Sequence, residues 1–120
     1  MGKTGYTGLR RLGWALIFSL RGFRAAWHHE SAFRQECLLL VIAVPLALWL
    51  AEGAIERALL IGVVGLILVV ELLNSGLEAA VDRTGDEDHP LAARAKDLGS
   101  AAVFAVITLA AIVWMLILWP

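Results

Sequence analysis

Apolar residues are concentrated in three runs that carry no charge, residues 37–51, 58–70 and 98–119. A helix needs about 20 residues, at 1.5 Å each, to cross a hydrocarbon core of about 30 Å. The last run has 22 residues and meets that length alone. The first run reaches that length if it includes residues 32–35 or if the local bilayer is thinner. The second reaches it only by including residues 71–82, which are polar. The pattern therefore predicts an all-α membrane protein with transmembrane helices over residues 32–51, 54–84 and 91–119.

A helix of another kind is predicted before these spans, over residues 6–27. Its apolar side chains recur at helical spacing, and arginines fall mainly on the other side. The apolar members are Leu9, Leu12, Leu16, Ile17, Leu20 and Phe23, and the arginines are Arg10, Arg21 and Arg24. This arrangement is typical of an amphipathic helix lying among lipid headgroups. A cleaved signal peptide is the alternative, but Arg21 and Arg24 follow its apolar stretch without a clear cleavage site.

The composition agrees with a membrane protein of one domain. Of the 120 residues, 60% are apolar and 18% are charged, against roughly 45–50% and 25% in soluble domains. Ten basic and eleven acidic side chains nearly cancel, so net charge indicates no nucleic-acid partner. No protein partner is implied either. The lone Cys37 cannot form a disulfide within the chain.

The distribution of charge predicts the orientation in the membrane. Six of the ten lysines and arginines precede Cys37, one (Arg57) lies in the first loop, and three lie in the second loop. Basic loops favour the cytoplasmic side. We therefore expect the N-terminus and the second loop in the cytoplasm and the C-terminus in the periplasm of a bacterial inner membrane. Tryptophans are expected at the far interface: Trp49, Trp114 and Trp119.

The polar residues that follow the second apolar run carry the most information. At 100° per residue they project onto one arc of about 100° on a helix. They are Glu71, Asn74, Ser75, Glu78 and Asp82. Ionisable groups at membrane depth are unfavourable and usually mark function. Emergence into water is the alternative, and it weighs more for Asp82 than for Glu71.

Further charged residues stand at the other junctions expected on the cytoplasmic side, namely Glu30, Lys96 and Asp97. Carboxylates, an amide and a lysine at one membrane face suit Mg²⁺ with a polyphosphate, because Mg²⁺ prefers oxygen ligands. A carboxylate near the lipid boundary could accept the proton of an alcohol. Without a P-loop or a GxGxxG motif in the chain, the residues alone predict metal-assisted phosphoryl transfer at the membrane and no particular acceptor.

Three segments resemble the prokaryotic integral-membrane diacylglycerol kinases. They are RAAWHHESAFRQE (24–36), VELLNSGLEAAVDR (70–83) and ARAKDLGSAAV (93–103). The resemblance covers nearly the whole chain and implies a homotrimer with active sites shared between neighbouring subunits. It also implies transfer of the ATP γ-phosphate to diacylglycerol, giving phosphatidic acid.

The resemblance assigns roles by motif position. Glu71 is the implied general base, with Asn74 and Asp82 in support, and Glu30 and Glu78 are implied ligands of Mg²⁺. The implied ATP site comprises Arg11, Phe18, Glu30, Glu78, Glu87, Asp88, His89, Lys96 and Asp97. The implied lipid contacts are Arg24, Trp27, Ser31, Arg34, Gln35, Trp49, Arg57, Glu71 and Ser100. One departure is Phe18, which stands where family members often have tyrosine.

Three other functions remain open at this point. Undecaprenol kinases share the fold and chemistry with a different lipid alcohol. A small ion- or proton-coupled transporter would use Glu71 and Glu78 as carrier carboxylates, although the carboxylates gather at one end of the spans. A catalytically silent membrane subunit would pack through its small residues, Gly62, Gly65, Ala101 and Ala105.

Overall fold

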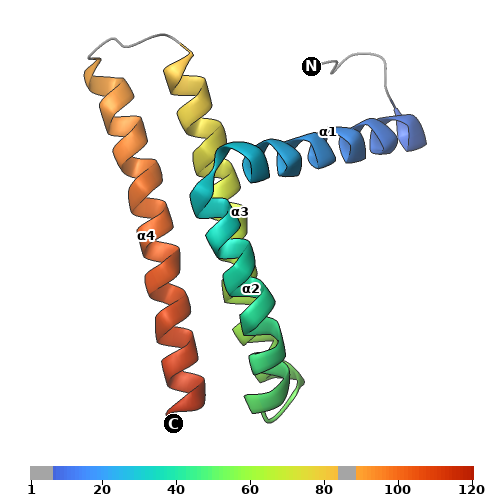
Figure 1. The fold of residues 1–120 in the computed structure, drawn as a ribbon, viewed down its shortest axis with the longest axis vertical. Coiled ribbons are helices and arrows are strands. Elements are labelled where there is room, and N and C mark those ends of the chain that lie inside the picture. The colour runs from blue at the N-terminus through green and yellow to red at the C-terminus, as the bar shows by residue number, and fades with distance from the viewer. Residues whose placement is uncertain (1–6, 84–88) are drawn as a thin grey trace.

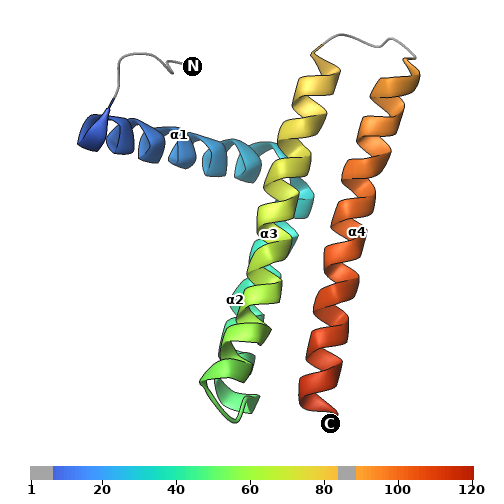
Figure 2. The ribbon, with the colours of Figure 1, turned by 180° about the vertical axis from the view of Figure 1, so that it is seen from behind.

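The computed structural model describes residues 7–83 and 89–120, and these residues form four α-helices. The helices are α1 (Gly8–His29), α2 (Ser31–Leu50), α3 (Ala54–Asp82) and α4 (Pro90–Leu118). Helices α2, α3 and α4 run alongside one another, whereas α1 projects sideways from them (Figure 1). Helix α3 packs against both α2 and α4, and α1 contacts α2 and α3. The view from behind shows α3 in front of α2 and beside α4 (Figure 2).

Helices α2, α3 and α4 are each long and apolar enough to cross a membrane, with 20, 29 and 29 residues. At 1.5 Å per residue α3 is about 43 Å long, which exceeds a hydrocarbon core of about 30 Å. One end of α3 therefore extends beyond the apolar layer. Pro45 lies inside α2 without ending it, although proline cannot donate the backbone hydrogen bond of that turn.

A single residue, Glu30, separates α1 from α2. Its backbone is extended, with φ −119° and ψ 108°, and this break turns the chain from the direction of α1 into that of α2 (Figure 1). Helix α1 ends at His29, two residues beyond the predicted bound, because its hydrogen bonding runs up to Glu30, whose N–H still reaches the carbonyl of Ala26 at 2.9 Å. The turn therefore occurs at a residue that carries a carboxylate.

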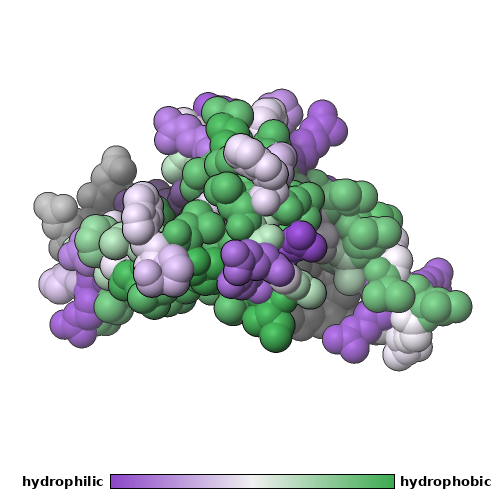
Figure 3. All heavy atoms as spheres, turned by 90° about the horizontal axis from the view of Figure 1, so that it is seen from below, coloured by the Kyte–Doolittle hydropathy of each residue, from purple (hydrophilic) through white to green (hydrophobic). Residues whose placement is uncertain are grey.

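Few apolar side chains are buried within the chain, although 60% of its residues are apolar. One cluster joins Ala47, Ala51 and Leu60, and a second joins Ile67, Val106 and Ala110. Hydrophobic side chains cover much of the outer surface seen from the end of the bundle where the C-terminus lies (Figure 3). An outer surface of this kind suits lipid or neighbouring membrane helices rather than water.

Trp114, one of the tryptophans expected at the far interface, makes contacts within the bundle near that end. Its ring packs against the cluster of Ala47, Ala51 and Leu60, and its Nε1–H donates to the backbone carbonyl of Leu60 at 3.1 Å. A buried indole usually finds a partner for its N–H, and here the partner belongs to α3. Trp114 therefore joins α4 to α3, whereas Trp119 is 81% exposed.

Candidate active site

The helix break brings Glu30 against α3. The hydroxyl of Ser75 donates to Oε1 of Glu30 at 2.9 Å and lies 3.4 Å from Oε2 of Glu71, one helical turn earlier. The shorter of the two is near the usual length for O–H···O hydrogen bonds, and the longer one is weaker. Ser75 thus connects the carboxylate between α1 and α2 with the carboxylate on α3.

Glu71 is buried, with 4% of its surface exposed. No other charged side chain is buried to this degree in the part of the chain that the structure describes. It follows directly after the uncharged residues 58–70 of α3. Burying a carboxylate is unfavourable unless it has partners. A buried glutamate at this position is therefore a candidate functional residue.

A further carboxylate, which sequence reasoning did not assign to the site, lies beside Glu71. Glu36 is on α2, and its carboxyl group lies close enough to that of Glu71 for the two to interact electrostatically. Its Oε1 is buried and has no hydrogen-bond partner among the described residues. Glu36 stands directly before the uncharged residues 37–51, as Glu71 directly follows another such run. The same argument that singled out Glu71 could therefore have found Glu36.

The amide of Asn74 is also part of this group. Its Oδ1 is buried and makes no hydrogen bond within the described residues. Its side chain packs against Gly99 of α4. Buried amide groups normally have partners, so this unpaired oxygen, one turn after the buried Glu71 on α3, is an unusual feature of the α3–α4 interface.

The next turns of α3 face the beginning of α4. Lys96 Nζ lies 2.8 Å from Oδ1 of Asp82, and Glu78 is close enough to act on the same ammonium group. The side chains of Lys96 and Asp82 are 42% and 61% exposed, so the pair contributes little to stability. Asp97, the next residue on α4, is exposed. A lysine that alternates between carboxylates and a phosphate would suit such a solvated edge.

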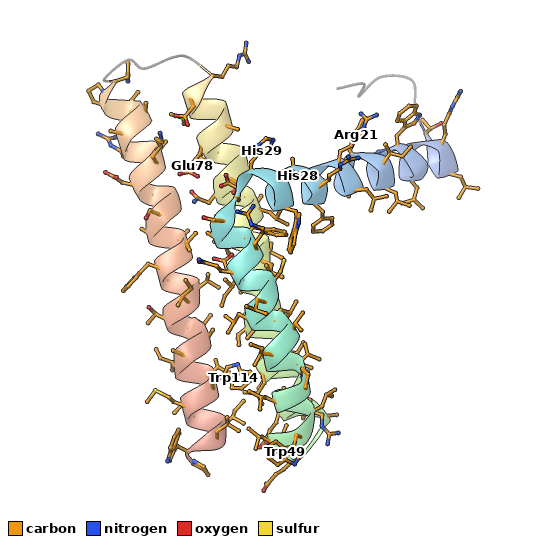
Figure 4. The ribbon with its side chains drawn as sticks, viewed as in Figure 1. Arg21, His28, His29, Trp49, Glu78 and Trp114 are labelled. Atoms are coloured by element: carbon orange, nitrogen blue, oxygen red, sulfur yellow. The ribbon has the colours of Figure 1, made fainter. Side chains whose placement is uncertain are left out.

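Two carboxylates near the Ser75 hydroxyl are the candidates to hold a magnesium ion shared with a polyphosphate. No cluster of three or more His, Cys, Asp or Glu side chains suited to a metal occurs among the described residues. Mg²⁺, however, is commonly held by one or two carboxylates together with substrate phosphates and water. Glu30 has a carboxylate oriented by Ser75, and Glu78 lies one turn beyond Ser75 on α3 (Figure 4). Two carboxylates are thus available from two different elements.

One chain does not bring all of the predicted nucleotide residues together. Phe18 stacks on Trp14 with a centroid separation of 5.8 Å, and Arg21 lies over the Phe18 ring. Phe18 and Arg11 both belong to α1. This helix projects away from α4 (Figure 1). His89 precedes α4, where its Nδ1 accepts the N–H of Leu91 at 3.0 Å. Glu87 and Asp88 lie outside the described residues.

The predicted lipid contacts also fall into separate groups. Near the helix break, Arg34 donates to the backbone carbonyl of Trp27 at 2.6 Å. The other exposed members of this group are Arg24, Ser31 and Gln35. Ser100 is exposed on α4. By contrast, Trp49 lies at the opposite end of the bundle from Glu78 (Figure 4), and Arg57 lies in the first turns of α3 at that same end.

A largely apolar groove of about 570 Å³ runs between α1 and α3, next to the carboxylates. Phe23 and Ala26 of α1 line one side, and Leu72 and Ala79 of α3 line the other. Glu30 and Ser75 are among the polar residues that line it, together with Ser19 and His29. The groove gives an apolar molecule access to the hydrogen bond between these two residues.

Fold and site together define an all-helical membrane protein with three candidate spans and carboxylates gathered toward one end of them. Residues 17–118 match the family model of the prokaryotic diacylglycerol kinases. The chain belongs to this family.

Individual relatives agree with this assignment. The diacylglycerol kinase of Escherichia coli strain K12 is 51% identical over 113 residues, which cover 94% of this chain and 93% of that protein. The diacylglycerol kinase of Pseudomonas aeruginosa is 51% identical over 114 residues, which cover 95% of this chain and 93% of that protein. The diacylglycerol kinase of Helicobacter pylori strain 26695 is 46% identical over 107 residues, which cover 89% of this chain and 84% of that protein. The similarity therefore extends over almost the full length of each chain.

Proposed function

We propose that this protein transfers the γ-phosphate of ATP to the free hydroxyl of diacylglycerol, giving phosphatidic acid and ADP. The observation that carries the proposal is the buried carboxylate of Glu71, connected through Ser75 to Glu30 beside an apolar groove. The naming of relatives about 50% identical as diacylglycerol kinases supports the acceptor. Membership of this family favours a kinase over a transporter or a silent membrane subunit.

In this proposal Glu71 is the general base and Asn74 supports it. The carboxylate takes the hydroxyl proton while the acceptor oxygen bonds to the γ-phosphorus, and the bond from that phosphorus to the oxygen of ADP breaks. Positioned acid–base groups typically contribute about 10²- to 10⁴-fold to the rate.

Glu30 and Glu78 are the proposed ligands of Mg²⁺. When bound, the ion neutralises charge on the phosphates of ATP. Ser75 holds Oε1 of Glu30 in place from α3, so that this ligand has a fixed orientation. Lys96 is proposed to bind a phosphate oxygen in exchange for Asp82, and Asp97 to line the same nucleotide site.

The position of Glu71 along α3 supports chemistry at the edge of the bilayer. Glu71 is 17 residues after the first residue of the helix, Ala54, which corresponds to about 26 Å at 1.5 Å per residue. A hydrocarbon core is about 30 Å thick. If the first turn of α3 lies at one boundary, Glu71 lies just inside the other, where a lipid hydroxyl and a water-soluble nucleotide can both reach it.

We further propose that this boundary faces the cytoplasm of a bacterial inner membrane. The distribution of lysine and arginine in the loops supports a cytoplasmic N-terminus and a periplasmic C-terminus. In this orientation α1 lies along the cytoplasmic surface with its apolar side toward the lipid. ATP is present on that side of the membrane.

The assembly that we propose is a homotrimer in which neighbouring subunits complete each site. Two observations support an oligomer. Apolar side chains are extensively exposed on the helices of one chain. The predicted ATP residues Arg11 and Phe18 lie on α1, which projects away from α4 (Figure 1), the helix that carries Lys96 and Asp97. A neighbouring subunit could bring its α1 to the α3–α4 edge of this chain.

The acceptor is tested with purified protein in mixed micelles that contain one candidate lipid at a time. Phosphate transfer from labelled ATP is measured for diacylglycerol and undecaprenol at equal mole fractions. We expect diacylglycerol to have the higher kcat/KM. Preference for undecaprenol would assign the chain to the other lipid alcohol, and phosphorylation of neither lipid would refute the kinase proposal.

A further inference from the structure

Gly99 of α4 approaches α3 more closely than any side chain would allow. A Cβ atom built on Gly99 would overlap the end of the Asn74 side chain and would lie 3.0 Å from Cδ2 of Leu77. Among the other glycines in the described part of the chain, a Cβ would meet no such neighbour within 4 Å. The space taken by a methyl group at position 99 is therefore already occupied by the Asn74 amide.

The amide of Asn74 is held in this space by shape. Its Oδ1 is buried and makes no hydrogen bond within the described residues. An amide that is oriented by hydrogen bonds would keep its place when a packing neighbour changes. Here the gap beside Gly99 is what admits the amide to the interface between α3 and α4.

We propose that Gly99 is a positioning residue for the phosphoryl transfer, because its missing side chain seats the Asn74 amide on the face of α3 that carries Glu71. The inference rests on the proposed function, in which Asn74 supports the base. Alanine at position 99 would push the amide out of the gap.

Displacement of this amide should lower activity without impairing folding. The atoms that must move are the ends of two side chains, Asn74 and Leu77, and both can rotate to other staggered positions. In addition, alanine favours a helix more than glycine does. We therefore expect Gly99→Ala to fold at least as well as the parent protein while its Asn74 amide sits elsewhere.

The first test observes the amide directly. Asn74 is the single asparagine of the chain, so protein labelled only in asparagine gives one pair of side-chain NH₂ signals in an NMR spectrum. We expect Gly99→Ala to move this pair. The matched control is Gly62→Ala, which adds the same methyl group to α3 where a Cβ meets nothing within 4 Å, and it should leave the pair in place. An unmoved pair in Gly99→Ala would overturn the proposal.

The second test is a double-mutant cycle on lipid phosphorylation, with thermal unfolding recorded for each variant. We expect Gly99→Ala to lower kcat about 10- to 100-fold without loss of thermal stability, because misplacement by an ångström can cost about a hundredfold. In an Asn74→Ala background, where the gap is empty, Gly99→Ala should cause no further loss. Additive losses would show that Gly99 acts independently of Asn74 and would overturn the proposal.

The same cycle separates this inference from the proposed function. Full activity of Asn74→Ala would refute the role of Asn74 and, with it, that of Gly99. An inactive Asn74→Ala together with a fully active Gly99→Ala would refute the role of Gly99 alone and leave the proposed function standing.

Discussion

The hydroxyl of Ser75 donates a hydrogen bond of 2.9 Å to Oε1 of Glu30, joining residues that are 45 positions apart in the chain. The bond fixes a carboxylate at the joint of two helices against the C-terminal part of a third. It also orients Glu30 next to Glu71, to which the same hydroxyl makes the longer contact. The proposed metal ligand and the proposed base are therefore coupled through one side chain.

Removal of this bond should weaken both the fold and the reaction. We expect Ser75→Ala to lower the free energy of unfolding by about 0.5–1.5 kcal/mol, the usual net contribution of such a bond, and to lower kcat as well. Thermal unfolding in micelles and lipid phosphorylation measure the two effects. In the control, Thr108→Ala, the lost bond runs only to the carbonyl of Phe104 within α4, and both quantities should change little. Parent-like values in Ser75→Ala would show that the bond is dispensable.

Glu71→Gln keeps the size and burial of the side chain but removes its ability to accept a proton at the reacting hydroxyl. We expect kcat to fall about 10²- to 10⁴-fold, with the oligomer intact on size-exclusion chromatography. Glu56→Gln is the control, because Glu56 lies at the other end of α3 and accepts the N–H of Glu52, which glutamine can also do. Unaltered turnover in Glu71→Gln would exclude Glu71 as the base.

The proposed metal site predicts a dependence on divalent cations. Chelation of Mg²⁺ should abolish phosphorylation, and added Mg²⁺ should restore it. Glu30→Gln and Glu78→Gln should each raise the Mg²⁺ concentration for half-maximal rate by at least about tenfold. This is the lower end of the loss in metal affinity that follows when residues around a bound metal are changed. Titration of activity with Mg²⁺ measures this shift. If the half-maximal concentration stayed the same in both variants, the ligands would have to be sought elsewhere.

Lys96 and its partner Asp82 should respond differently to substitution. We expect Lys96→Met to lower kcat/KM for ATP by about 10²-fold or more, as loss of a charged group that stabilises a transferring phosphoryl group does. Asp82→Asn should leave thermal unfolding almost unchanged, because the pair is exposed. Equal kcat/KM in Lys96→Met and the parent protein would remove Lys96 from the nucleotide site.

Trp114 offers a test of the fold that leaves the reaction untouched. Trp114→Phe removes the N–H that reaches Leu60, and we expect a loss of about 0.5–1.5 kcal/mol in the free energy of unfolding. The kinetic constants for ATP should stay close to those of the parent protein. Trp119→Phe serves as the control, since Trp119 is 81% exposed. A decrease in kcat without loss of stability would contradict this separation.

Much of the helical fold follows from the hydrophobic pattern, because the three apolar runs are interrupted by charged and turn-forming residues. The arc of polar residues on α3 follows from helical periodicity alone. Contacts between helices do not follow from periodicity, since they depend on how far each helix is rotated and shifted against its neighbours. Glu36 shows the difference: the sequence places it at the start of a span, and only the packing of α2 on α3 brings it to Glu71.

Trp114 and Gly99 illustrate the same limit. Their chemical character allows several roles, an interfacial anchor for the tryptophan and a packing site for the glycine. The neighbours that decide between these roles, Leu60 and Asn74, are contributed by another helix. Sequence periodicity gives the face of a helix on which a residue lies, but not the partner that this face meets.

The single-residue joint between α1 and α2 also sets a rule for insertions. A residue added at the end of α1 and absorbed into that helix would rotate all preceding side chains by about 100° around its axis. The face of α1 that we propose lies on lipid would then turn partly toward water, even though Glu30 still met Ser75. The spacing between the apolar side chains of α1 and the joint is thus constrained, whereas residues added before α1 would leave that face unchanged.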